Sequence, residues 1–153
     1  MTGLFSAVGN ENDRGTRFFR GDEFLNFLRI NPTDVGWMKI DVEGFEMNVI
    51  RGFSNTLEKT KAVLEIEINK NTMMLSKFRL SEIFEYMEKY SYSAYVDITV
   101  KEKFHNKNAY CDDAFDIYFI KSTIKQYLSV KFNFFEITKK ECLEWDKKYL
   151  DIN

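Results

Sequence analysis

Three carboxylates follow two strand-like segments of the sequence, where a sheet could bring them together. Asp41 and Glu43 come at the end of the segment 36–42, and Glu67 comes at the end of the segment 62–68. Both segments alternate apolar and polar residues with the period of a strand. In an open α/β sheet, ligands bind outside the carboxyl ends of the strands. These acids are therefore the first candidates for chemistry.

A purely structural role competes with a chemical one at each acid. A carboxylate after a strand can cap the next helix, because helix N-termini favour negative charge. Asp41 is the stronger candidate, since Lys39 shares its face of the strand and buried charges need partners. Glu65 shares the face of Glu67 and can pair with Lys39. So many charges are unusual for a strand that is only structural.

The elements that must position these acids alternate between helix and strand. The sequence predicts a helix from Asp22 to Pro32, a strand at 36–42, a helix to about Glu58, a strand at 62–68, a helix around 80–87, strands at 93–100 and 114–120, and a helix from Thr138. Such an order is typical of a mostly parallel sheet, ending here in an antiparallel C-terminal strand pair at its edge. Four strands are fewer than a doubly wound sheet usually carries, so we expect part of a sheet.

Three local signals refine these boundaries. Asp22 fits the N-cap of the first helix, and Thr138 with Glu141 fits a capping box on the last one. Gly52 lies inside a predicted helix, where it costs about 1 kcal/mol relative to alanine. Close packing of Gly52 against a strand would explain it.

Composition excludes several classes of protein. The chain has 153 residues, enough for one domain, and its 44% hydrophobic and 30% charged residues are typical of a globular fold. Its net charge of -2 argues against a general nucleic-acid binder, and no apolar run is long enough to span a membrane. No secretory signal is visible, and the two cysteines are isolated, so we expect a reduced, cytoplasmic chain.

One segment resembles the signature of FkbM-type methyltransferases: Lys39-Ile40-Asp41-Val42-Glu43-Gly44-Phe45-Glu46, followed by Val49-Ile50-Arg51-Gly52. These are S-adenosylmethionine-dependent O-methyltransferases with a Rossmann-like fold. The segment 62–68 is similar to the next strand of the family, which also ends in an acid. The resemblance covers roughly residues 4–120 and implies a partial Rossmann-like α/β domain.

The resemblance also implies roles for four acids. Asp41 would face the methyl donor or the acceptor hydroxyl, Glu43 and Glu46 would shape the same pocket, and Glu67 would line its far side. Asp41, Glu43 and Glu67 are the expected catalytic residues, and Asp41 and Glu46 the expected contacts to S-adenosylmethionine. A carboxylate that takes the hydroxyl proton is the favoured chemistry. No metal site is expected, because the spacing of these acids along the chain matches no standard ligand set.

The chain departs from the family in one respect. Such enzymes begin with a strand and a glycine-rich turn that approaches the cofactor, whereas Gly3, Gly9 and Gly15 are spaced too widely for that turn. We therefore expect residues 1–153 to form a single methyltransferase-like domain without the glycine-rich part, corresponding to the C-terminal half to two-thirds of the family's domain. A truncated reading frame, a split enzyme and a degenerate paralogue all fit this pattern.

The expected function is methylation of a hydroxyl on a sugar or small metabolite, with no nucleic-acid or membrane partner. Two alternatives stay open. A non-catalytic module would pair with a partner chain or upstream segment that completes the sheet. A metal-dependent nuclease would use Asp41 and the acids at 65–67 in an Asp…Glu-x-Lys core. That core needs a lysine at position 67, which is Glu here, and Lys70 lies past the end of the strand.

Other groups are weaker candidates. His105 with the segment 111–113 could bind a metal, but an exposed polar loop is the simpler interpretation. The segments 132–135 and 73–75 are expected to pack in the core or at its edge, although the first could also seal a pocket.

Overall fold

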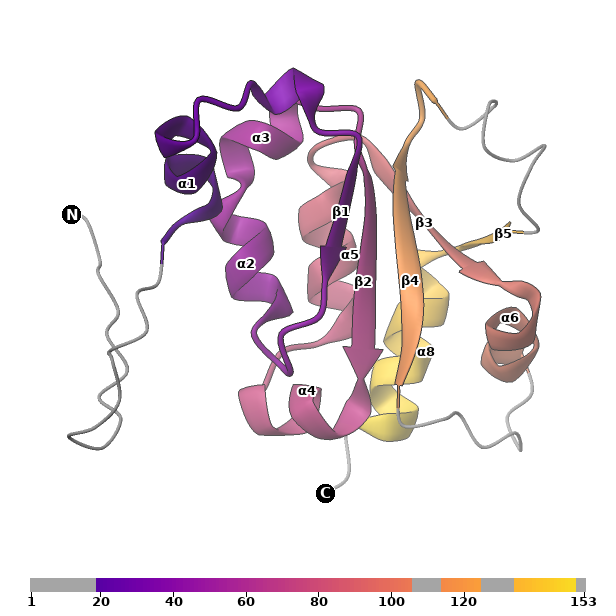
Figure 1. Cartoon of the computed structure of the whole chain (residues 1–153). Helices are drawn as coiled ribbons and strands as arrows, with labels where there is room; N and C mark the ends of the chain where they lie inside the picture. Colours follow the sequence, from indigo (N-terminus) through magenta and orange to yellow (C-terminus); the bar gives the residue numbers. More distant parts are fainter. Residues whose placement is uncertain (1–18, 106–113, 125–133, 151–153) are drawn as a thin grey trace, which may run out of the picture.

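The computed structural model describes residues 19–105, 114–124 and 134–150. Within these residues, five strands form one mixed sheet (Figure 1). The strands are β1 (Trp37–Ile40), β2 (Val63–Asn69), β3 (Tyr92–Asp97), β4 (Ala114–Lys121) and β5 (Phe134–Ile137). The helices are α1 (Gly21–Phe27), the short 3-10 helix η1 (Pro32–Asp34), α2 (Glu46–Gly52), α3 (Ser54–Lys59), α4 (Lys70–Ser76), α5 (Leu80–Glu88), α6 (Ile98–His105) and α8 (Lys139–Tyr149).

The sheet is mixed, with the strand order β1-β2-β4-β3-β5. Only β1 and β2 pair in parallel, and the other three neighbouring pairs are antiparallel. The α/β class is confirmed, whereas the expectation of a mostly parallel sheet was wrong. The antiparallel pairing of β3 and β4 is confirmed, but β4 lies inside the sheet rather than at its edge. β4 pairs with β2 along one edge and with β3 along the other, and the order of strands along the chain cannot reveal this insertion.

Four of the described elements escaped the sequence prediction: η1, α4, α6 and β5. η1 and α4 have three and seven residues, too few for a helical period to stand out. β5 was expected to be a packed aromatic cluster, because four residues are too few to show a clear alternation. α6 begins at Ile98, so residues 98–100, which were expected to end a strand, are helical. The rest of α6 lies in the connection that was expected to be polar and without a helix, and α6 has little apolar periodicity. β5 pairs with β3 and covers the edge that the prediction left open.

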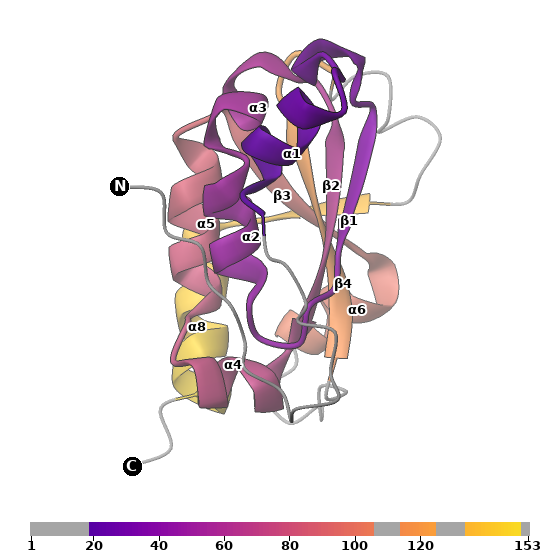
Figure 2. The same cartoon turned by 60° about the vertical axis from the view of Figure 1, so that its left-hand side comes forward.

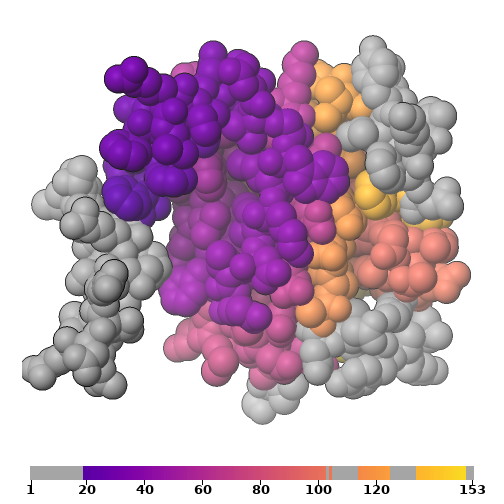
Figure 3. Space-filling model, in the orientation of Figure 1, coloured from indigo at the N-terminus to yellow at the C-terminus, as the bar shows by residue number. Residues whose placement is uncertain are grey.

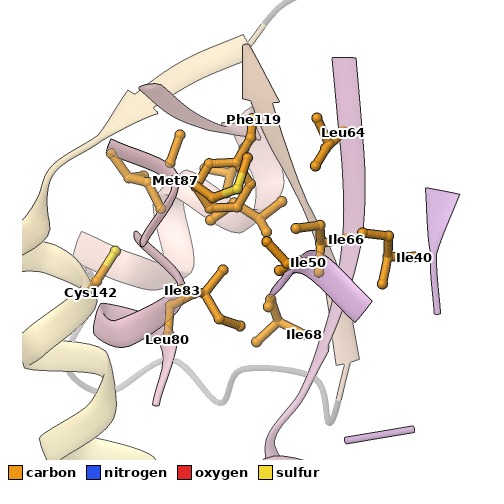
Figure 4. Close-up of a cluster of buried hydrophobic side chains, with 14 of the residues drawn as sticks. Ile40, Ile50, Leu64, Ile66, Ile68, Leu80, Ile83, Met87, Phe119 and Cys142 are labelled. Atoms are coloured by element: carbon orange, nitrogen blue, oxygen red, sulfur yellow. The ribbon is translucent and has the colours of Figure 1, made fainter. Parts of the chain in front are cut away.

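The hydrophobic core lies between the sheet and the helices. Figure 2 shows α2, α3, α5 and α8 on one side of the sheet. The alternating residues Leu64, Ile66 and Ile68 of β2 are fully buried, and they face Ile83 and Met87 of α5 (Figure 4). The period of two along β2 therefore sends the apolar residues into the core and leaves Glu65 and Glu67 on the opposite face.

The predicted helix after β1 is two helices, α2 and α3, that meet at Phe53. Gly52 ends α2 and packs closely, as expected, but against α1 rather than against a strand. A Cβ atom on Gly52 would lie 3.2 Å from the backbone nitrogen of Gly21, and a Cβ on Gly21 would overlap the Phe53 ring. The two glycines thus let α1 approach the junction of α2 and α3.

The sequence predicted that Asp22 caps its own helix, and this prediction was wrong, because the N-cap residue of α1 is Arg20. The Asp22 carboxylate accepts hydrogen bonds from the backbone nitrogens of Asn55 and Thr56, at 2.9 Å each, and from the Thr56 hydroxyl at 2.6 Å. Asp22 therefore caps α3, which has no capping side chain of its own. The sequence places an acid near a helix start but cannot say which helix it serves.

The Asp22→Ala substitution is expected to lower the free energy of unfolding by about 1–2 kcal/mol, because it removes the cap of α3. Urea denaturation measures this loss. Glu23→Ala is the matched control, since Glu23 is the exposed neighbour in the same helix turn and should change stability by less than about 0.5 kcal/mol. Equal effects of the two substitutions would contradict the capping role.

The last helix begins as predicted. The Thr138 hydroxyl accepts from the Glu141 backbone nitrogen at 3.3 Å, and the Glu141 carboxylate accepts from the Thr138 backbone nitrogen at 2.7 Å. This reciprocal pair confirms the capping box. Ile137 and Cys142 on either side of it are both buried.

Candidate functional site

The carboxyl ends of β1 and β2 bring Asp41, Glu43 and Glu67 together. One carboxylate oxygen from each residue lies within 4.8 Å of the other two. The parallel pairing aligns Ile40 with Ile66, so the chain leaves both strands at the same edge of the sheet. The three acids of the sequence prediction thus form one group, called the carboxylate cluster below.

The cluster lies where the sheet is open to solvent. Asp41 and Glu43 are exposed, and Glu67 is half-buried. In the space-filling view, side chains of β4 are visible along the sheet beside β2, so no described helix covers that part of the face (Figure 3). A ligand could therefore reach the cluster without displacing any described helix.

The turn after β1 has an unusual backbone. Glu43 and Gly44 have φ angles of 52° and 98°, both in the left-handed region. Gly44 is buried, and a Cβ atom there would lie 2.9 Å from the carbonyl oxygen of Thr72 in α4. Glycine is needed at position 44 for both reasons, its φ angle and its contact with Thr72.

Glu46 lies beneath this turn rather than on the open surface. Its side chain is buried, and its Oε1 atom accepts from the backbone nitrogens of Val42 at 3.3 Å and Gly44 at 3.0 Å. The expected contact between Glu46 and the cofactor stays a prediction. The hydrogen bonds that the structure shows for Glu46 are to the turn that carries Glu43.

A fourth carboxylate, Asp116 of β4, borders the cluster. The pairing of β2 and β4 places Asp116 opposite Glu67. Lys39 lies 3.5 Å from Asp41 and 4.0 Å from Asp116, measured from Nζ to the carboxylate oxygens, so it pairs with these two acids rather than with Glu65 as expected. The sequence analysis missed Asp116, because finding it requires the register of an antiparallel partner far along the chain.

Charge and burial shift two pKa values at the site. Burial raises the pKa of Glu67, and the negative charges of Asp41, Glu43 and Asp116 raise it further, while Lys39 opposes them. Burial alone would lower the pKa of Lys39, but the carboxylates of Asp116 and Asp41 outweigh it, and the net shift is upward. Glu67 is therefore the acid of the cluster that holds a proton more readily than an ordinary glutamate.

The raised pKa of Glu67 predicts a pH dependence of stability. Above the ordinary glutamate pKa, the folded chain binds more protons than the unfolded chain, so the free energy of unfolding falls as the pH rises through the window between the two values. Glu67→Gln should remove this decrease and stabilise the chain at neutral pH. Urea denaturation from pH 4 to 8 measures it, with Glu58→Gln, at an exposed glutamate, as the control. A steeper decrease in the Glu67 variant would contradict the assignment.

The cluster could also hold a divalent cation. Carboxylate oxygens are the ligands that Mg²⁺ and Ca²⁺ prefer, and these three lie close enough for one ion to contact all of them. The spacing along the chain gave no sign of this, since the acids come from two segments joined only by the sheet. The arrangement can thus accept a proton, attract a positive charge or bind a cation.

Other predicted candidates are placed only in part. Met73 is buried in the core as expected, whereas Met74 and Leu75 are 44% and 84% exposed, because one side of the short helix α4 meets the core. Phe134 stacks on Tyr118 with ring centroids 4.4 Å apart. The segments 111–113 and 132–133 lie outside the described residues, as does the His105 side chain.

One known protein family matches the part of the chain that contains the cluster. The family described as the methyltransferase FkbM domain matches residues 16–94, just over half of the chain. This chain therefore belongs to the FkbM methyltransferase domain family. The match lies in the N-terminal part of the chain and is shorter than the expected 4–120; it includes β1, β2 and the whole carboxylate cluster.

No curated protein and no solved structure matches the chain significantly. Among the described helices, none has the length and apolar character needed to cross a bilayer.

Proposed function

We propose that this chain is an S-adenosylmethionine-dependent O-methyltransferase domain that acts on a hydroxyl of a sugar or small metabolite, in the cytoplasm. The observation that carries the proposal is the carboxylate cluster at the carboxyl ends of β1 and β2. It lies inside the segment matched by the methyltransferase family. Substrates of open α/β folds bind at this edge of the sheet.

The chemistry of the donor set fits the cofactor. S-adenosylmethionine supplies a methyl group on a positively charged sulfur, together with an amino group and ribose hydroxyls. Asp41, Glu43 and Glu67 supply negative charge and hydrogen-bond acceptors within one small region. Such groups favour a positive ligand and accept hydrogen bonds from its hydroxyl and amino groups.

In the proposed mechanism, Asp41 is the general base. With S-adenosylmethionine bound to supply the methyl group, the exposed carboxylate of Asp41 would take the proton of the acceptor hydroxyl. Lys39, 3.5 Å from Asp41, orients that carboxylate. Glu43 and Glu67 flank it, and burial together with the neighbouring carboxylates raises the pKa of Glu67 above that of an ordinary glutamate.

The free edge of β1 suggests that more polypeptide completes the site. Among the described residues, β1 pairs with β2 on one side only. Trp37 of β1 and Phe45, which follows β1 in the chain, are 49% and 62% exposed. An unpaired strand edge beside exposed aromatic residues favours association. We propose that an upstream segment or a partner chain pairs with β1 and adds the glycine-rich contacts to the cofactor.

Calorimetric titration with S-adenosylhomocysteine tests the proposed function. We expect saturable binding to one site, weakened at least tenfold by Glu67→Lys, which replaces a hydrogen-bond acceptor of the cluster by a cation that repels the ligand's amino group. Asp34→Lys is the matched control, since Asp34 is exposed before β1, at the opposite end of that strand. Absence of binding to a folded chain would contradict a cofactor site formed by this chain alone, and would leave only a site that another segment completes.

Light scattering tests the proposed pairing of another segment or chain with β1. Pairing at the β1 edge predicts self-association or dye binding to exposed apolar surface. A monodisperse monomer that binds no such dye would argue against an unfilled interface.

A further inference from the structure

The buried carboxylate of Glu46 connects the carboxylate cluster to the core. Glu46 is the first residue of α2, and its side chain is only 5% exposed. Its Oε1 atom accepts from the backbone nitrogens of Val42 and Gly44. These two nitrogens lie on either side of Glu43, so one carboxylate oxygen holds both flanks of a residue in the cluster.

The backbone that Glu46 holds is strained. Glu43 has a φ angle of 52°, and a non-glycine residue in this region costs about 1 kcal/mol or more. Such a conformation persists only where surrounding contacts enforce it. The two hydrogen bonds to Glu46 supply that enforcement from below, and they leave the Glu43 side chain free to project toward Asp41 and Glu67.

A second contact fixes the turn to the segment that carries Glu67. Gly44 packs against the carbonyl of Thr72 so closely that a Cβ atom would lie 2.9 Å from its oxygen. Thr72 is in the first turn of α4, directly after β2, and that turn is capped by Asn69, whose Oδ1 accepts from the Thr72 nitrogen at 3.4 Å. The two carboxylate-bearing segments are thus held against each other through backbone contacts.

From this geometry we infer that Glu46 is a positioning residue, whose hydrogen bonds to Val42 and Gly44 hold Glu43 and Asp41 beside Glu67. The inference rests on the proposed function only in naming the cluster as the reacting site. This positioning role depends on the length of the glutamate side chain more than on its charge. Aspartate at position 46 keeps the charge but is one methylene too short, whereas glutamine keeps the reach and one carbonyl acceptor.

Amide hydrogen exchange on the folded chain tests this inference without any cofactor. In Glu46→Asp, exchange at Val42 and Gly44 should accelerate about tenfold or more, whereas Glu46→Gln should retain most of the protection. The side-chain carboxyl carbon signals of Glu43 and Glu67, recorded at fixed pH, should move more in Glu46→Asp than in Glu46→Gln. The same pair of substitutions at Glu82, an exposed glutamate in the first turn of α5, is the control and should move neither readout.

Each result decides between reach and charge. Faster exchange in Glu46→Gln than in Glu46→Asp would overturn the inference, because charge alone would then hold the turn. Faster exchange in Glu46→Asp without a change in the carboxyl signals would also overturn it, because the turn would not position the cluster. Failure to bind S-adenosylhomocysteine would contradict the proposed function and leave these exchange results intact.

Discussion

Replacing Asp146 by alanine is expected to lower the free energy of unfolding by about 3 kcal/mol. Asp146 is a buried acid of α8, 2% exposed. Its two oxygens accept from the backbone nitrogens of Leu80 at 2.9 Å and Ser81 at 3.0 Å. These nitrogens begin α5, whose N-cap residue Arg79 has no capping hydrogen bond from its side chain. The substitution would leave both nitrogens buried and unpaired, and it would also loosen the contact between α5 and α8.

Urea denaturation of Asp146→Ala and Glu144→Ala separates this effect from a general loss of helix charge. Glu144 lies on the exposed face of α8, where its ion pair with Lys140, at 3.9 Å, is exposed to solvent. Surface pairs of this kind contribute little. A loss smaller than about 1 kcal/mol in Asp146→Ala would show that water replaces the missing carboxylate.

The second large effect is expected at Asp41. Asp41→Asn should lower the rate of methyl transfer about 100- to 10,000-fold, because asparagine cannot take the proton of the acceptor hydroxyl. Stability should change little, since Asp41 is exposed and its ion pair with Lys39 is a surface pair. Release of S-adenosylhomocysteine, measured with a hydroxyl acceptor that supports turnover, gives the rate.

Asp34→Asn is the control for Asp41→Asn. It makes the same change of one oxygen to nitrogen at an exposed aspartate before β1, away from the cluster. A rate for Asp41→Asn within about threefold of this control would remove Asp41 from the role of general base and leave Glu43 and Glu67 as the remaining acids of the cluster.

Local patterns in the sequence were sufficient to predict the site's strands. The alternation at 62–68 predicted β2 to within one residue at each end, and the spacing around 80–87 predicted α5. The gathering of Asp41, Glu43 and Glu67 followed from the rule that parallel strands end at one edge. These predictions depend on neighbours in sequence and on one parallel pair.

Features that depend on long-range pairing could not be predicted. The insertion of β4 between β2 and β3 brings Asp116 to Lys39 and Glu67. The residue pattern within β4 does not indicate which strands lie beside it. Asp22 and Asp146 each cap a helix to which they do not belong. In each case the side chain acts on a segment distant in sequence, so its contacts are set by packing rather than by local propensity.

The most direct test of the central claim is a titration of the labelled chain with S-adenosylhomocysteine followed by backbone NMR. Binding at the carboxylate cluster predicts that the amide signals of residues 41–44 and 67–69 shift in a saturable way. Residues 33–36 and 60–62, at the opposite end of β1 and β2, should stay in place. Shifts confined to that opposite end, or none at all in a chain whose spectrum shows it to be folded, would contradict the assignment of the cluster as the cofactor site.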